Sequence, residues 1–149
     1  MLNLIDAFSK YAWSKKLKNN MAKAILEAFK RIIKNSKRQT KFIWVDEGKE
    51  FYNKMITAQL CKHKITRYST HSEHKSTIIE RFNRTLKTSM WKKVTLENTR
   101  TWIDVIDKIV NEYNNRKHLT IKMTLIEVSK KKNEEVIFKN VNKKIRTKE

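Results

Sequence analysis

The sequence predicts an α/β domain with a mixed sheet flanked by helices, and three observations support this. Four short segments are rich in apolar, β-branched or aromatic residues, which is typical of strands. Between and after them, apolar residues recur every three or four positions, which is typical of amphipathic helices. The two patterns interleave in the order β-β-α-β-α-β-α-α, which indicates one layered domain.

Different sequence signals mark the ends of the expected elements. Phe8–Lys10 separates the first two apolar runs, which favours a hairpin, and Asn19 or Asn20 can cap the helix that follows. The third strand ends at Asp46, shortly before Gly48, the only glycine. In order, we expect strands at 2–6 and 11–17, a helix at 21–34, a strand at 41–45, a helix at 50–62 and a strand at 65–70. Two longer helices follow. The apolar stripe of the first consists of Ile79, Phe82, Leu86 and Met90, and that of the second of Trp102, Ile106, Ile109 and Tyr113.

Composition narrows the classes of function. Lys and Arg number 35 against 15 Asp and Glu, which gives a net charge of +20 and a pI near 10.1. Such an excess favours a polyanionic partner, most often nucleic acid, although AT-rich coding would also raise the number of lysines. No apolar run approaches the roughly 20 residues that span a bilayer, so no membrane partner is expected. The single cysteine, Cys61, cannot form an internal disulfide.

Two acidic residues are candidates for catalysis. Asp46 stands at the carboxyl end of a predicted strand, where active-site residues of α/β sheets tend to lie. Glu80 is inside a predicted helix and shares a face with Asn83, Arg84 and Lys87. These carboxylates could bind a hard cation while the basic groups hold phosphates. Position alone favours the non-catalytic interpretation, in which Asp46 is a turn former and Glu80 an exposed, ion-paired residue.

Five segments, in order and at compatible spacing, resemble the catalytic core of retroviral and retrotransposon integrases, and most of all the cores of transposon-derived animal proteins. The stretch from Val45 to Asn53 resembles the family's T-D-N-G-x-E-F block, and 33 residues separate Asp46 from Glu80, against about 35 in the family pattern. The resembling segments are Ile5–Trp13, Val45–Asn53, Tyr68–Ser72 with Ile79–Lys87, Glu112–Asn115 with Lys117–His118, and Met123–Val128.

The resemblance implies a ribonuclease H-like fold and a domain that cuts and joins DNA strands with Mg²⁺ or Mn²⁺. Asp46 and Glu80 would be catalytic residues and the second and third metal ligands. Asn83, Arg84 and Lys87 would face the DNA. Integration of a mobile element also implies DNA as partner, a nuclear location and a possible homo-oligomer. Residues 1–128 would form the core, and residues 129–149 a basic tail.

Several departures from the family pattern bear on catalysis. The family's first aspartate lies on a strand before the hairpin, and that strand lies centrally in the sheet, beside the strand that ends at Asp46. We therefore expect the first strand to be missing, and the copy to be truncated and catalytically incomplete. Asp6 matches a position that is not a metal ligand in the family, so we do not assign it to the triad. Glu47 replaces the usual asparagine and Leu125 the usual proline.

Two alternatives to an integrase-like enzyme remain at this point. One is a relic or domesticated protein that binds DNA without catalysis. The other is a basic structural protein, such as a ribosome-associated one, whose motifs match by chance. Of the remaining candidates, Trp44, Trp91 and Trp102 are expected to be core or half-buried packing residues rather than base-stacking platforms, and Cys61 to be a small buried side chain.

Overall fold

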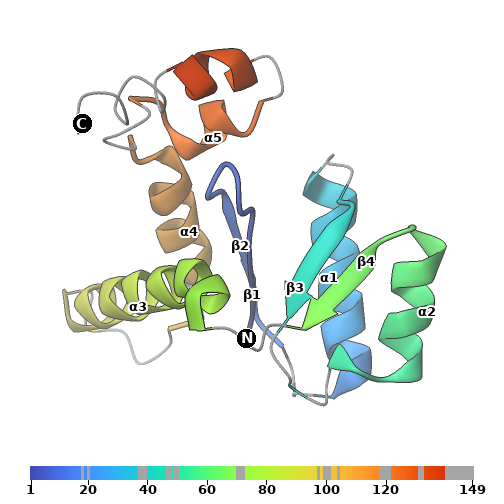
Figure 1. The fold of residues 1–149 in the computed structure, drawn as a ribbon. Helices are drawn as coiled ribbons and strands as arrows, with labels where there is room; N and C mark the ends of the chain where they lie inside the picture. Colours follow the sequence, from blue (N-terminus) through green and yellow to red (C-terminus); the bar gives the residue numbers. More distant parts are fainter. Residues whose placement is uncertain are drawn as a thin grey trace. The chain divides into compact units, whose positions relative to one another are not determined.

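A computed structural model describes residues 1–17, 19, 21–36, 40–45, 48, 51–69, 73–96, 98, 102–103, 105–117, 122–130 and 133–139. The elements follow the predicted order, and one short helix is added after them (Figure 1). In chain order they are β1 (Leu2–Ile5), β2 (Ala12–Lys15), α1 (Ala22–Ser36), β3 (Phe42–Val45), α2 (Lys54–Lys62), β4 (Thr66–Ser69), α3 (Glu73–Leu96), α4 (Ile106–Asn115) and α5 (Leu125–Val128).

The chain divides into two compact units. The first comprises Met1–Asn3 with Ser14–Arg81, and the second comprises Leu4–Trp13 with Phe82–Glu149. The strands of the described residues form two sheets of two strands each, β1 with β2 and β3 with β4. The mixed character expected from the sequence is therefore present as one hairpin and one parallel pair.

The hairpin β1–β2 closes through the side chain of Asp6. Residues 6–11 are too few for a parallel crossover, so the two strands run antiparallel. The Asp6 N–H donates to the Tyr11 carbonyl at 2.9 Å, and its carboxylate accepts from the Ser9 hydroxyl at 2.6 Å. The Phe8 N–H also donates to this carboxylate, and Lys10 adopts a φ of 59°. An aspartate-based turn thus reverses the chain without a glycine.

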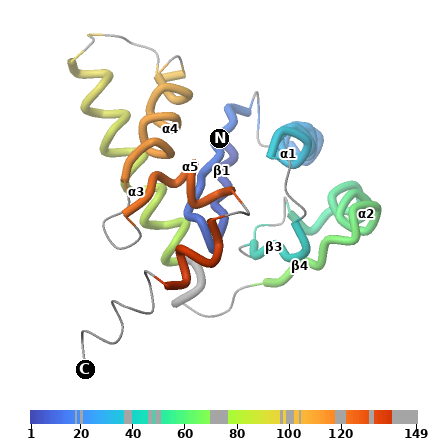
Figure 2. The backbone as a smooth tube through the Cα atoms, turned by 90° about the horizontal axis from the view of Figure 1, so that it is seen from above, coloured from blue at the N-terminus to red at the C-terminus, as the bar shows by residue number. Residues whose placement is uncertain are grey.

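In the first unit, helices α1 and α2 cover one side of the parallel pair β3–β4 (Figure 2). The two strands start and end together, because Phe42 pairs with Thr66 and Val45 with Ser69. Helix α1 packs against α2, and α2 against β4. The apolar residues of α1 are buried at the helical spacing predicted from the sequence; they are Ile25, Leu26, Ala28, Phe29 and Ile32.

Both ends of α2 are capped by local hydrogen bonds. The Asn53 side chain accepts from the Ile56 N–H at 3.0 Å, which is the usual arrangement of an N-cap. At the other end Lys64 takes a φ of 53°, and its N–H donates to the Cys61 carbonyl. The Ile65 N–H then donates to the Leu60 carbonyl, which completes a Schellman motif with lysine where glycine is usual.

The second unit is built on α4 and on the part of α3 from Phe82 onward, which pack side by side (Figures 1 and 2). The ring of Phe82 meets the ring of Tyr113 edge-on, with centroids 4.9 Å apart. Helix α4 contacts α5, and α5 begins with a capping box. Beyond it, residues 134–139 are helical, and Ile137 is buried against Val128. The boundary expected near residue 128 stays a prediction.

Three expectations about side-chain burial or helix bounds are wrong. Helix α4 begins at Ile106, so Trp102 lies before it in a turn and is 39% exposed. Trp91 is not packed in the core but is 72% exposed on α3. Cys61 is exposed, because the apolar face of α2 is formed by Ile56 and Leu60. Among the described helices, none is long and apolar enough to cross a membrane.

Candidate functional site

Four of the five predicted site residues lie on α3. They are more exposed than the residues on the side of the helix that packs. Phe82 and Leu86 are almost fully buried. Glu80, Arg84 and Lys87 are exposed, and Asn83 is half-buried. Steps of four and three residues return to the same side of an α-helix, so Glu80, Arg84 and Lys87 form one stripe. The expected grouping of an acid with basic residues is present along this part of the helix.

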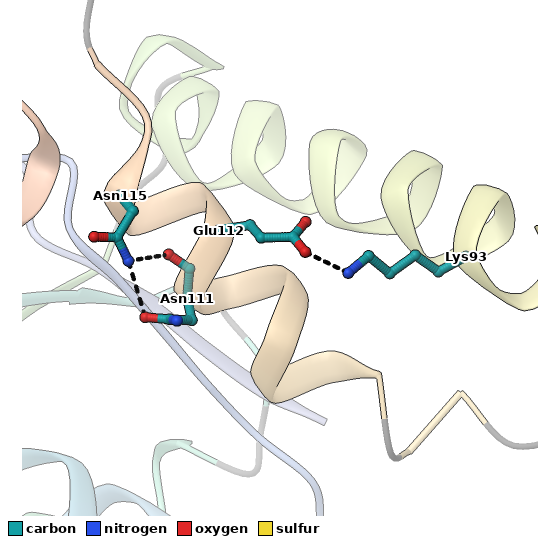
Figure 3. Close-up of polar contacts among 4 residues, drawn as sticks. All are labelled: Lys93, Asn111, Glu112 and Asn115. Atoms are coloured by element: carbon teal, nitrogen blue, oxygen red, sulfur yellow. Dashed lines mark hydrogen bonds and ion pairs between the residues drawn. The ribbon is translucent and has the colours of Figure 1, made fainter. Parts of the chain in front are cut away.

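Contacts with α4 fix the orientation of Arg84 and Lys87 within the second unit. Beside the Phe82–Tyr113 ring contact, the Lys93 ammonium pairs with the Glu112 carboxylate at 2.5 Å (Figure 3). Burial between the helices raises the pKa of Tyr113, although the Arg116 guanidinium partly lowers it. Because α3 packs on α4 along this side, the other side of α3, with Arg84 and Lys87, remains accessible.

Asp46, the fifth predicted residue, lies outside the described residues, so its distance from Glu80 stays a prediction. What the structure describes is the strand that leads to it. Strand β3 ends at Val45, directly before Asp46, and Val45 is level with Ser69 at the end of β4. The chain continues from Ser69 toward α3, which carries Glu80. We therefore expect Asp46 at the edge of the sheet where active-site residues of parallel strands gather.

The carboxylate of Glu80 suits a hard divalent cation in its chemistry and accessibility. Oxygen ligands are those that Mg²⁺ prefers, and Mg²⁺ usually keeps several waters and substrate phosphate oxygens. Within the described part of the chain, no three His, Cys, Asp or Glu side chains gather closely enough to hold a metal. Asp46 and Glu47, which directly follow β3 in the sequence, lie outside that part.

Asp6 is engaged elsewhere and is not a candidate ligand. Its carboxylate accepts hydrogen bonds from Ser9 and Phe8 within the hairpin turn. Recruiting this side chain to a metal would remove the contacts that close the turn. The exclusion of Asp6 from the catalytic set stays a prediction, which these turn contacts support.

Arg67 on β4 was not singled out from the sequence, yet it holds the segment that follows Asp46. Its guanidinium donates to the Phe51 carbonyl at 2.6 Å and lies 4.3 Å from the centre of the Tyr52 ring. The same group reaches the Thr57 hydroxyl at 3.4 Å. Arg67 therefore anchors the far end of the loop that leaves β3. Its partners are 10 to 16 residues away, so no local motif could reveal it.

Two of the segments that resemble the integrase pattern have structural roles. The amide of Asn114 pairs with the backbone of Ala12, which ties α4 to the hairpin. At α5, the Thr124 hydroxyl accepts from the Glu127 N–H, and the Glu127 carboxylate accepts from the Thr124 N–H at 2.8 Å. These residues position helices in the second unit and supply no ligand to the candidate site.

Comparison with known proteins agrees with the resemblance found in the sequence. No protein-family model matches the chain. A transposon-derived protein of Caenorhabditis elegans is 36% identical over 115 residues, which are 77% of this chain and 40% of that protein. The chain thus spans less than half the length of this relative.

Solved structures match over most of the chain. The catalytic core of human T-lymphotropic virus 2 integrase, solved with magnesium in a trimeric form, gives a TM-score of 0.76 at 16% identity, covering 86% of this chain and 82% of that one. The bovine immunodeficiency virus integrase core gives 0.73 at 14% identity, with 88% and 85% covered. A simian T-cell lymphotropic virus intasome gives 0.77 at 16% identity, with 84% and 46% covered.

The helix that carries Glu80 and Arg84, the hairpin and the parallel strand pair together fit one known architecture. The chain has the ribonuclease H-like fold of retroviral integrase catalytic cores and is related in sequence to a transposon-derived protein.

Proposed function

We propose that this chain is an integrase-like domain of a mobile element that binds DNA along α3 and serves metal-dependent DNA strand transfer. The observation that carries the proposal is the exposed stripe on α3, where Arg84 and Lys87 follow the Glu80 carboxylate at helical spacing. Basic side chains at this spacing suit the phosphate backbone, and the adjacent acid suits a cation bound to the same phosphates.

Asp46 and Glu80 would hold the metal, Mg²⁺ or Mn²⁺. When bound, such an ion supplies positive charge to the oxygens that attack and leave during phosphoryl transfer. Asn83, Arg84 and Lys87 would hold the DNA backbone beside it. The magnesium found with a related core supports this choice of metal. A substrate of chromosomal DNA places the domain in the nucleus, and the dimeric and trimeric forms of that core support a homo-oligomer.

The alternative is a relic that binds DNA without catalysis, and one structural observation favours considering it. The fold's first strand would lie between the hairpin and the strand that ends before Asp46. In the described residues these form two separate sheets, β1–β2 and β3–β4. Without a strand between them, β1 and β3 would each present an unpaired edge. The 149 residues would then supply two of the family's three acids.

The strand-transfer domain and the non-catalytic relic would both bind DNA, and salt-dependent binding to duplex DNA tests this common property. Affinity should fall steeply as salt rises, because each neutralised phosphate releases counterions. Arg84→Ala and Lys87→Ala should each reduce the slope of log affinity against log salt by about one unit. Lys23→Ala on α1 removes the same charge from an exposed site and serves as the control. Equal changes in all three variants would show that only net charge matters and would contradict binding along α3.

The metal has a readout that does not depend on activity. In buffer with EDTA, Glu80→Gln should tighten DNA binding, because it removes a negative charge beside the phosphates. With Mg²⁺ present, the wild type should regain affinity through the bound ion, whereas Glu80→Gln should not. If the DNA affinity of Glu80→Gln responds to Mg²⁺ as that of the wild type does, Glu80 is not a metal ligand.

A further inference from the structure

Trp91 continues the stripe that begins at Glu80. Among the described residues no other aromatic side chain is as exposed, at 72%. It follows Lys87 by four residues, Arg84 by seven and Glu80 by eleven, which is the repeat of one helical face. At 1.5 Å per residue the stripe is about 16 Å long, the rise of about five base pairs.

The surroundings of Trp91 are cationic. From Arg81 to the end of α3 at Leu96 the helix contains no acidic residue. On the neighbouring helix α4, the Glu112 carboxylate is paired with Lys93. Lys87 and Lys92 are exposed on either side of the indole. A large apolar ring is thus presented to solvent within a surface that repels basic proteins and attracts polyanions.

An exposed aromatic ring beside lysines is the combination used for unpaired nucleic acid. Bases in single strands stack on such rings, while the cations follow the phosphate backbone. The bases of an intact duplex are already stacked on each other, so a helix that lies along the backbone cannot offer them a ring without distorting the duplex. An unpaired base at a DNA end has a free face.

We infer that Trp91 is a stacking platform for an unpaired base at the end of DNA whose backbone is bound by Arg84 and Lys87. This inference rests on the proposed DNA binding and adds the structure of the preferred substrate, a DNA end with single-stranded nucleotides. The indole contributes to affinity only where a base is free to stack. The basic residues contribute to both paired and unpaired DNA.

The test compares a blunt duplex with the same duplex carrying a three-nucleotide single-stranded overhang. Wild-type chain should bind the overhang more tightly. Trp91→Ala should weaken binding of the overhang by about tenfold, within the range for loss of one stacked base, and change binding of the blunt duplex by less than about twofold. Trp91→Phe keeps a ring and should retain most of the affinity. Trp102→Ala removes another partly exposed indole of the same unit, one that lies outside α3, and should leave both affinities unchanged.

The outcomes separate the two proposals. If wild type binds neither ligand at low salt, the proposed function fails and the stacking site with it. If the wild type binds both DNAs but Trp91→Ala lowers the affinity for both equally, or for neither, Trp91 is not a stacking platform. DNA binding along α3 would still stand. A Trp91→Ala variant that changes only the sedimentation coefficient of the free chain would assign the ring to a contact between copies and would also overturn the inference.

Discussion

The side-chain amide of Asn114 pairs with the backbone of Ala12 through two hydrogen bonds. The Ala12 N–H donates to Asn114 Oδ1 at 2.9 Å, and Asn114 Nδ2 donates to the Ala12 carbonyl at 2.8 Å. Both residues are buried. The amide thus satisfies one donor and one acceptor on the edge of β2, as a neighbouring strand would, and joins α4 to the hairpin.

Replacing Asn114 should destabilise the fold. Asn114→Leu should lower the free energy of unfolding by about 2–4 kcal/mol, because it leaves a buried N–H and a buried carbonyl without partners. Asn114→Asp should also be destabilising, since one carboxylate oxygen would face the Ala12 carbonyl oxygen. Urea unfolding measures both. Asn115→Ala is the control, because Asn115 is exposed and bonds only to Asn111 on its own helix, and it should change stability by less than about 0.5 kcal/mol (Figure 3).

The capping box of α5 should make the start of this helix sensitive to acid. The backbone hydrogen bond from Thr124, followed by its side-chain bond, lowers the pKa of Glu127 below its ordinary value of 4.5. A lowered pKa means that the ionised form stabilises the folded cap. This contribution is complete above the ordinary pKa and is lost as pH falls through the lowered one. Amide exchange at Glu127 should therefore accelerate relative to the rest of the unit as the pH falls below this ordinary value and through the lowered pKa.

A comparison of variants isolates this effect. Glu127→Gln keeps a hydrogen-bond acceptor but does not titrate, so the acid-dependent loss of protection at α5 should disappear. Thr124→Ala removes the N-cap hydroxyl, and should reduce protection of α5 at every pH. If Glu127→Gln shows the same pH profile as wild type, another group controls the end of the helix.

Arg67 should not be replaceable by lysine. The planar guanidinium donates to the Phe51 carbonyl and lies over the Tyr52 ring, and a lysine ammonium reproduces the charge but not this geometry. Arg67→Lys should therefore cost about 1–2 kcal/mol of stability, measured by urea unfolding. Arg84→Lys makes the same change at an exposed position and should be neutral. Equal stability of the two variants would show that the contacts of Arg67 contribute little.

The elements were predictable from the sequence because their signals are local. The period of α1 and the apolar residues of β1 and β3 lie within single segments, and their placement is confirmed. Helix α5, only four residues long, was not predicted, although the Thr124-x-x-Glu127 spacing of its capping box is also a local signal. The contacts of Arg67 and Asn114 join distant parts of the chain, so a single sequence holds no signal for them.

The site was predictable to a smaller extent, and Trp91 shows why. Phe82, Leu86 and Met90 were correctly placed toward one side of a helix, and successive residues on a helix differ by about 100°. Trp91 directly follows Met90 and so must point away from the side that packs. Hydrophobicity alone suggested a core residue, whereas the register of the helix predicts exposure. For Asp46, the structure describes only the strand that precedes it.

The last prediction is that these 149 residues alone do not catalyse strand transfer. The family pattern has two aspartates and a glutamate, and the resemblance supplies Asp46 and Glu80 only. Loss of one ligand removes negative charge from a site that must hold divalent ions in fixed positions, and this catalysis is mainly electrostatic. A labelled DNA end with Mn²⁺ should therefore remain uncut.

The informative comparison is a chain extended before Met1 by a family-like strand that carries an aspartate. In the family's fold such a strand pairs between the hairpin and the strand that precedes the second aspartate, and it would also supply the third carboxylate. Extension should therefore raise the urea midpoint as well as confer nicking, and Glu80→Gln in the extended chain should abolish nicking while the midpoint stays high. Nicking by the 149 residues themselves, lost in Glu80→Gln, would contradict the prediction. It would also require a third ligand within this sequence, and because the carboxylate of Asp6 closes the hairpin turn, Glu47 and Glu50, both near Asp46, would be the first residues to replace.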